Sequence, residues 1–216
     1  MAKTTTWQDE YWLPVMQLYL RKPTGPKPIY SRDTVELGME LHIHPQQLHK
    51  RMMQLTALNT PRLERIWQRY AESPRSLARA VRLWREMKGF GSAGEFYEGV
   101  EVQETFEKDF RPLAEDQRFC PAMLILVLDL YFQLVPATMV AQTPEVVQLA
   151  QLLKLKAEDV EEVLYLFQLC DPYLNRVDLS MSPLLLPCQQ VWRRFEKGGP
   201  TQLSAFAREL KEYFIG

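Results

Sequence analysis

Apolar residues recur at helical spacing through most of the chain. Leu48, Met52 and Leu55 are four and three residues apart, and residues 77–84 repeat this spacing. Because residues three and four apart share one face of a helix, both segments are predicted to be amphipathic helices. No stretch shows the clean alternation of apolar and polar residues that is typical of a half-buried strand. The pattern therefore predicts an all-α fold.

The most apolar run extends over 13 residues from Met123 to Val135 and includes Asp129 and Gln133. It is too short and too polar to span a bilayer, so we expect a buried helix there. The first twelve residues contain no apolar stretch of the kind found in secretory signals. The three cysteines are an odd number, which fits a reducing compartment better than a disulfide scaffold. We therefore expect a cytoplasmic protein without membrane association.

The two halves of the chain resemble each other. Residues 13–62 match residues 125–174 without a gap at an offset of 112, apolar position against apolar position. The offset then grows by 13, after which Trp67 matches Trp192. The extra residues fall within 176–187, where serines and prolines indicate an inserted loop. This self-similarity predicts tandem duplicated helical units.

Charge divides the chain in the same way. Residues 1–91 contain 15 Lys and Arg against 8 Asp and Glu, whereas residues 92–216 contain 11 against 19. We expect a basic repeat at 1–91, a Gly-rich and then acidic linker at 92–118, and an acidic repeat at 119–216. The asymmetry is typical of a half that meets a polyanion, and equally of two halves that attract each other.

Glycines at the start of the expected linker form the pattern Gly89-x-Gly91-x-x-Gly94. A dinucleotide-binding loop with this pattern follows a strand and opens a helix within a βαβ unit. Here a charged helical segment precedes the glycines and no strand is predicted. The segment is therefore interpreted as a linker between domains.

Each repeat contains two predicted helices joined by a tight turn. Gly38, Ile43 and Leu48 stand where such a bend needs a small residue, an apolar turn residue and an apolar residue of the second helix, and residues 150–160 repeat the arrangement. Both stretches resemble the helix-turn-helix superfamily of bacterial DNA-binding proteins over about 20 residues. The first departs from the superfamily pattern at Arg51, where an apolar residue is usual. The resemblance implies a helix-turn-helix-like core in each unit, degenerate in the second.

The second helix of the first motif has a distinctive outer face. Since Leu48, Met52 and Leu55 are expected to point inward, helical geometry turns Gln and Lys side chains outward, and these reach base edges and phosphates in a major groove. Arginines follow at spacings i, i+3 and i+7, on one side of the next helix; as an alternative, they only solvate that helix. The candidate residues for binding double-stranded DNA are Gln46, His49, Lys50, Gln54, Arg62, Arg65 and Arg69.

The corresponding face of the second repeat carries different chemistry. Glu158 and Glu162 stand where phosphates would approach, so this copy is predicted not to bind DNA. Tyr165, Leu166 and Leu169 form an apolar tip, which is typical of a contact surface. We expect the inserted loop, the first repeat or another subunit to cover this tip.

Catalytic and metal-binding patterns are scarce. His42, His44 and His49 lie close together in the sequence, but no nearby Cys, Asp or Glu completes a ligand set, so we predict no metal. The cysteines have apolar neighbours, where a thiol behaves as a small hydrophobic group. No nucleophile elbow, P-loop or zinc-protease motif is present. We therefore expect neither an enzyme nor a cofactor-binding protein.

Two functions from different classes remain. In the first, the basic repeat reads DNA and the acidic repeat mediates assembly with a protein partner or a second copy. In the second, the chain is a helical adaptor that binds proteins and no nucleic acid. The net charge of −1 counts against the first, because independent DNA-binding proteins are usually basic.

Overall fold

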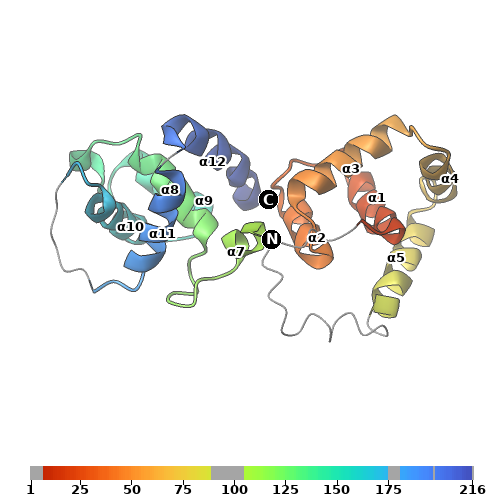
Figure 1. Ribbon diagram of the computed structural model, residues 1–216, viewed down its shortest axis with the longest axis horizontal. Helices are drawn as coiled ribbons and strands as arrows, with labels where there is room; N and C mark the ends of the chain where they lie inside the picture. The colour runs from red at the N-terminus through yellow and green to blue at the C-terminus, as the bar shows by residue number, and fades with distance from the viewer. Residues whose placement is uncertain (1–6, 89–104, 175–180, 197, 216) are drawn as a thin grey trace. The chain divides into compact units, whose positions relative to one another are not determined.

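The computed structural model describes residues 7–88, 105–174, 181–196 and 198–215, and every regular element in these ranges is a helix (Figure 1). This agrees with the all-α prediction. The chain divides into two compact units, residues 1–104 and 105–216, which are described separately. None of the described helices is long and apolar enough to cross a lipid bilayer.

Unit 1 consists of short helices whose starts follow from the sequence. Prolines occupy the first turns of α3, α4 and α5, where the missing N–H has no partner to lose. The Thr60 hydroxyl caps α4 by accepting from the Leu63 amide at 3.3 Å. The elements are η1 (Asp9–Tyr11), α1 (Trp12–Leu20), α2 (Arg32–Leu41), α3 (Pro45–Ala57), α4 (Pro61–Tyr70) and α5 (Pro74–Lys88).

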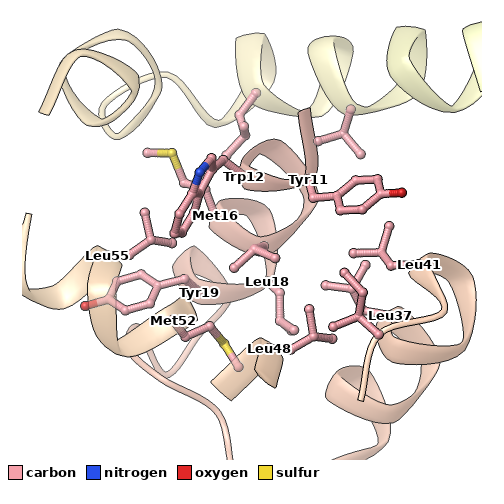
Figure 2. Packing of buried hydrophobic residues seen from close by; sticks show 14 of the residues in the cluster. Tyr11, Trp12, Met16, Leu18, Tyr19, Leu37, Leu41, Leu48, Met52 and Leu55 are labelled. Atoms are coloured by element: carbon pink, nitrogen blue, oxygen red, sulfur yellow. The ribbon is translucent and has the colours of Figure 1, made fainter. Parts of the chain in front are cut away.

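The core of unit 1 forms around α1, which packs against α2, α3 and α5. Figure 2 shows Met16 and Tyr19 of α1 facing Met52 and Leu55 of α3, while Leu37 of α2 lies across from them. The predicted inner face of α3 is confirmed, since Leu48, Met52 and Leu55 are all buried. This packing turns the opposite face of α3 away from the core.

Unit 2 forms around α8, whose side chains are almost all buried, as the apolar run predicts. The helix ends at Tyr131, earlier than the run does, and Phe132 and Val135 are exposed. Its neighbours are α7, α9, α10, α11 and α12. The elements are α7 (Thr105–Phe110), α8 (Pro121–Tyr131), η2 (Pro136–Thr138), α9 (Pro144–Leu153), α10 (Ala157–Cys170), α11 (Leu185–Phe195) and α12 (Gly199–Ile215).

Helix bounds in the two units follow the offset found in the sequence. The α9–α10 pair starts at 144 and 157 where α2 and α3 start at 32 and 45. Both pairs turn through one left-handed residue, His42 at φ 55° and Lys154 at φ 58°. The aromatic pairs also correspond, with ring centroids 5.8 Å apart for Tyr19–Trp67 and 5.7 Å apart for Tyr131–Trp192. These likenesses support a duplication, which stays a prediction.

Two expected boundaries differ from the structure. The expected linker at 92–118 contains α7, and Phe106 and Phe110 on that helix are buried in unit 2. The expected inserted loop at 176–187 ends early, because α11 begins at Leu185. In both places a short apolar segment packs against helices that are far away in the sequence. Local composition does not reveal such packing. The Gly89–Gly94 pattern lies outside the described residues.

Candidate nucleic-acid interface

The outer face of α3 is open to solvent. Gln46, Lys50 and Met53 are exposed at spacings of four and three residues, so they form one stripe opposite the buried residues. Lys50 has no ion-pair partner among the described residues. The helix contains no Asp or Glu, so nothing on it repels a phosphate. The stripe therefore matches the predicted face at Gln46 and Lys50.

The histidines of this region have separate structural roles. His42 adopts the left-handed turn conformation, and the Nδ1 atom of His44 caps α3 by accepting from the Gln46 amide at 3.2 Å. His49 donates from Nδ1 to the carbonyl oxygen of Lys27 at 2.8 Å, which ties α3 to the preceding loop. One ring nitrogen of His49 is therefore already engaged, and the predicted DNA contact at His49 stays a prediction. No metal-ligand cluster occurs in the described part of the chain.

Lys27 holds the same loop together. Its ammonium group is buried and donates to the carbonyl oxygens of Arg21, at 2.6 Å, and Pro23. Burial lowers the pKa of Lys27, because a charged group loses solvation in the protein interior. Lys27 thus holds the loop between α1 and α2 through two contacts. Its side chain binds carbonyl groups of the loop, and its own carbonyl oxygen accepts from His49 on α3. This in turn fixes the position of α3.

The arginines of α4 are exposed, as the spacing predicts, but they differ in their contacts. Arg62 forms a 2.6 Å ion pair with Asp9. Arg65 donates from Nε to the Pro61 carbonyl at 3.2 Å, and Arg69 lies over the Tyr70 ring at 5.4 Å. Within the described ranges, neither Arg65 nor Arg69 has an acidic partner. These two guanidinium groups are therefore available to an anion, whereas Arg62 is partly neutralised.

A pocket of about 290 Å³ joins α3 and α4. It brings together two of the predicted residues, Gln54 and Arg62, with seven that sequence reasoning did not assign to a site. Arg51 donates to Gln54 Oε1 at 3.0 Å, and its guanidinium lies 4.5 Å from the centre of the Trp7 ring. The lining residues are Trp7, Asp9, Trp12, Arg51, Gln54, Asn59, Thr60, Arg62 and Leu63.

A signal for this pocket exists in the sequence. Arg51 occupies a position where the resembled superfamily has an apolar residue, so an unusual partner was to be expected for it. Trp7 and Trp12 are near the N-terminus and far from Arg51 in the sequence, and only packing places them beside it. Met52, which is completely buried, supplies the apolar packing that the superfamily has at the position of Arg51.

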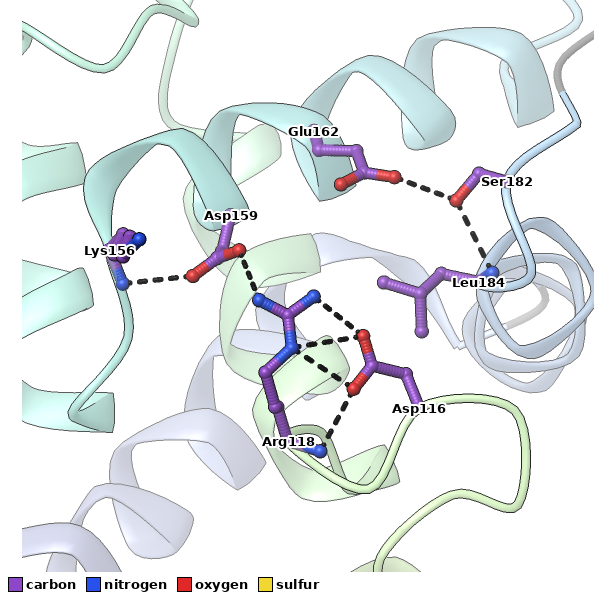
Figure 3. A network of polar contacts seen from close by, with 7 residues as sticks. All are labelled: Asp116, Arg118, Lys156, Asp159, Glu162, Ser182 and Leu184. Atoms are coloured by element: carbon purple, nitrogen blue, oxygen red, sulfur yellow. Dashed lines mark hydrogen bonds and ion pairs between the residues drawn. The ribbon is translucent and has the colours of Figure 1, made fainter.

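Two carboxylates of α10, those of Asp159 and Glu162, bind to other residues of unit 2 (Figure 3). Asp159 accepts from the Lys156 amide at 3.0 Å and from Arg118 at 2.7 Å. Arg118 also holds Asp116 at 2.7 Å, and these hydrogen bonds lower the pKa of Asp116. Glu162 accepts from the Ser182 hydroxyl at 2.7 Å. Asp159 and Glu162 are therefore tied to neighbouring segments, whereas Glu158 is exposed and has no side-chain hydrogen bond or ion pair within the described ranges.

One tie corresponds to a contact in unit 1 with the donor and acceptor exchanged. Glu161 stands 112 residues after His49, and it accepts from the Ala141 amide at 3.0 Å. His49 donates to the carbonyl oxygen of Lys27 before α2, two residues before the position equivalent to Ala141. The two helices are anchored at the same position by opposite chemistry. The outer faces differ because Ser182 contacts Glu162 on α10, whereas Lys50 at the equivalent place on α3 has no such partner in the described chain.

The predicted partner-contact residues are largely covered inside unit 2. Leu166 is buried, while Tyr165 and Leu169 are half-buried. Leu184, two residues after Ser182, which donates to Glu162, is also buried. The prediction that this tip is covered is confirmed for Leu166. The prediction that Leu166 meets a partner is corrected, because it has no surface left to offer.

Comparison with known proteins adds no relative to this description: no protein family, curated protein or solved structure matches the chain.

Proposed function

We propose that unit 1 binds double-stranded DNA, with α3 as the element that meets the major groove. The observation that carries the proposal is the exposed stripe of Gln46, Lys50 and Met53 on a helix without carboxylates. Amide and ammonium donors on such a stripe are suited to base edges and phosphates. Arg65 and Arg69 on the exposed side of α4 supply further positive charge. The α2–α3 pair then acts as a helix-turn-helix.

The contrast with α10 supports this assignment. The position of Lys50 is occupied in unit 2 by Glu162, which accepts from Ser182, and the segment around Ser182 lies against α10. An open basic helix and a tied acidic helix at equivalent places are consistent with one binding copy and one structural copy. We therefore assign DNA binding to unit 1 alone.

The test is fluorescence anisotropy with a mixed-sequence duplex at several salt concentrations. Neutralising Lys50, Arg65 and Arg69 together to Gln is expected to weaken binding and to lower the salt slope by about three units, since each lost phosphate contact removes roughly 0.9. The matched control neutralises three exposed basic residues of unit 2: Lys154, Arg193 and Arg208. An equal loss of affinity in both triple variants refutes the assignment to unit 1.

A protein adaptor is the second candidate, and exposed apolar side chains favour it. Met53, at the C-terminal end of the α3 stripe, is 50% exposed, and Leu83 and Met87 on α5 are exposed as well. Large apolar side chains on a surface are typical of protein contacts. An adaptor is expected to show no salt-dependent duplex binding at any ionic strength. The same anisotropy experiment therefore separates the two candidates.

A further inference from the structure

The pocket between α3 and α4 has a mostly apolar wall, into which a small group of polar side chains is set. Two guanidinium groups, Arg51 and Arg62, line it together with the side chains of Gln54, Asn59 and Thr60. Asp9 is the one carboxylate in the lining, and it faces Arg62 at 2.6 Å. Donors and positive charge therefore exceed acceptors and negative charge. Such a lining favours an anion with several oxygen atoms.

Trp7 lines the same pocket and positions one of its two guanidinium groups. Its indole nitrogen Nε1 is buried and has no hydrogen-bond partner among the described residues. Trp7 also supports Arg51, whose guanidinium lies 4.5 Å from its ring centre and 5.8 Å from that of Trp12. Arg51 is thus held in place, and its hydrogen bond to Gln54 uses one of its five N–H groups.

The size of the pocket limits what it holds. At about 290 Å³ it lies at the lower edge of the range for small-molecule sites, so it suits a single oxyanion group better than a large ligand. Phosphate fits the guanidinium groups in a bidentate manner. The ion pair between Asp9 and Arg62 is half-exposed, at 51% and 53%, and such pairs are weak enough for another anion to replace the carboxylate.

We infer that this pocket binds a phosphate group through Arg51 and Arg62 beside the Trp7 ring, and that Asp9 competes with the phosphate for Arg62. Where the phosphate belongs to a DNA backbone, the inference rests on the proposed function. In that setting the pocket fixes one backbone position beside α3, and Asp9 lowers the affinity. Where the phosphate is free, the pocket is an anion site in its own right.

The experiment titrates the full-length protein with inorganic phosphate and records the indole N–H signals by NMR, the Trp7 signal being assigned with Trp7→Phe. We expect the Trp7 signal to shift on addition of phosphate. Asp9→Asn is expected to tighten phosphate binding roughly two- to fivefold, the range that corresponds to losing a weak competing ion pair. Arg62→Gln is expected to weaken binding and to abolish the gain from Asp9→Asn in the double variant.

Glu10→Gln is the matched control, because Glu10 is the neighbouring exposed carboxylate and its loss changes net charge equally. An equal gain from Glu10→Gln and Asp9→Asn overturns the inference, as does the absence of any Trp7 shift at millimolar phosphate. The same variants titrated with a duplex distinguish the source of the phosphate. A gain from Asp9→Asn with both probes assigns the pocket to the DNA backbone. Phosphate binding without duplex binding keeps the inference and refutes the proposed function.

Discussion

Replacing Phe106 or Phe110 by Ala tests whether α7 belongs to the core of unit 2. The composition of the segment predicts a linker, in which either change would be without consequence. In the structure the two rings are 3% and 7% exposed, and the Phe110 ring centre lies 4.7 Å from that of Tyr213 on α12. Truncating a buried Phe to Ala costs about 3–5 kcal/mol, which is the sum of lost transfer energy and an unfilled cavity.

Hydrogen exchange followed by mass spectrometry measures this loss in the full-length chain and separates the units. A loss of about 3–5 kcal/mol accelerates exchange in α8 by roughly a hundred- to several-thousand-fold, because each 1.4 kcal/mol is a factor of ten. Peptides from α1 to α5 are expected to exchange as before. Phe132→Ala is the control, since that ring is 48% exposed and less packing is lost. Unchanged exchange in α8 on truncating Phe106 and Phe110 refutes the assignment of α7 to unit 2.

Two further predictions concern α10 and its surroundings. Leu184→Ala is expected to destabilise unit 2 by about 2–5 kcal/mol in urea unfolding, because the Leu184 side chain is 1% exposed. The control Leu186→Ala is expected to cost much less, because Leu186 is 55% exposed. Equal effects of the two substitutions would contradict the placement of Leu184 against the core. Burial raises the pKa of Cys170 from 9.0 to about 11, so the unfolded chain loses its thiol proton first and the stability of unit 2 is expected to fall as pH rises from 9.0 to about 11. A smaller decline in Cys170→Ala than in the wild type checks this, and an identical decline excludes the thiol as its cause.

The residues of the candidate interface divide by how far their roles depend on distant partners. Lys50 and Gln46 were placed correctly from periodicity, because the burial of Leu48, Met52 and Leu55 fixes which side of α3 faces outward. His49 lies near the edge of that face, where a contact with the loop carbonyl of Lys27 decides its role. No spacing rule reveals such a contact. Arg62 was correctly placed on an exposed face, but its pairing with Asp9 was not foreseen.

The carboxylates of α10 give the same lesson from the other unit. Their sequence pattern indicates repulsion of phosphate, and this remains consistent with the structure. Their ties to Arg118, Ala141 and Ser182 depend on three segments that meet only after folding. Side-chain identity therefore determines what a carboxylate repels, and tertiary contacts determine what it binds.

The sequence by itself determined the helical class, the inner face of α3 and the equivalence of the α2–α3 and α9–α10 bounds. These properties depend on neighbours within about four residues, or on a comparison of the chain with itself. Only the tertiary structure decided that α7 joins unit 2, that Arg51 lies on Trp7, and that Asp9 neutralises Arg62. The physical reason is that a buried ring or a paired charge is stabilised by whichever group packing brings to it, and that group is often far away in the sequence.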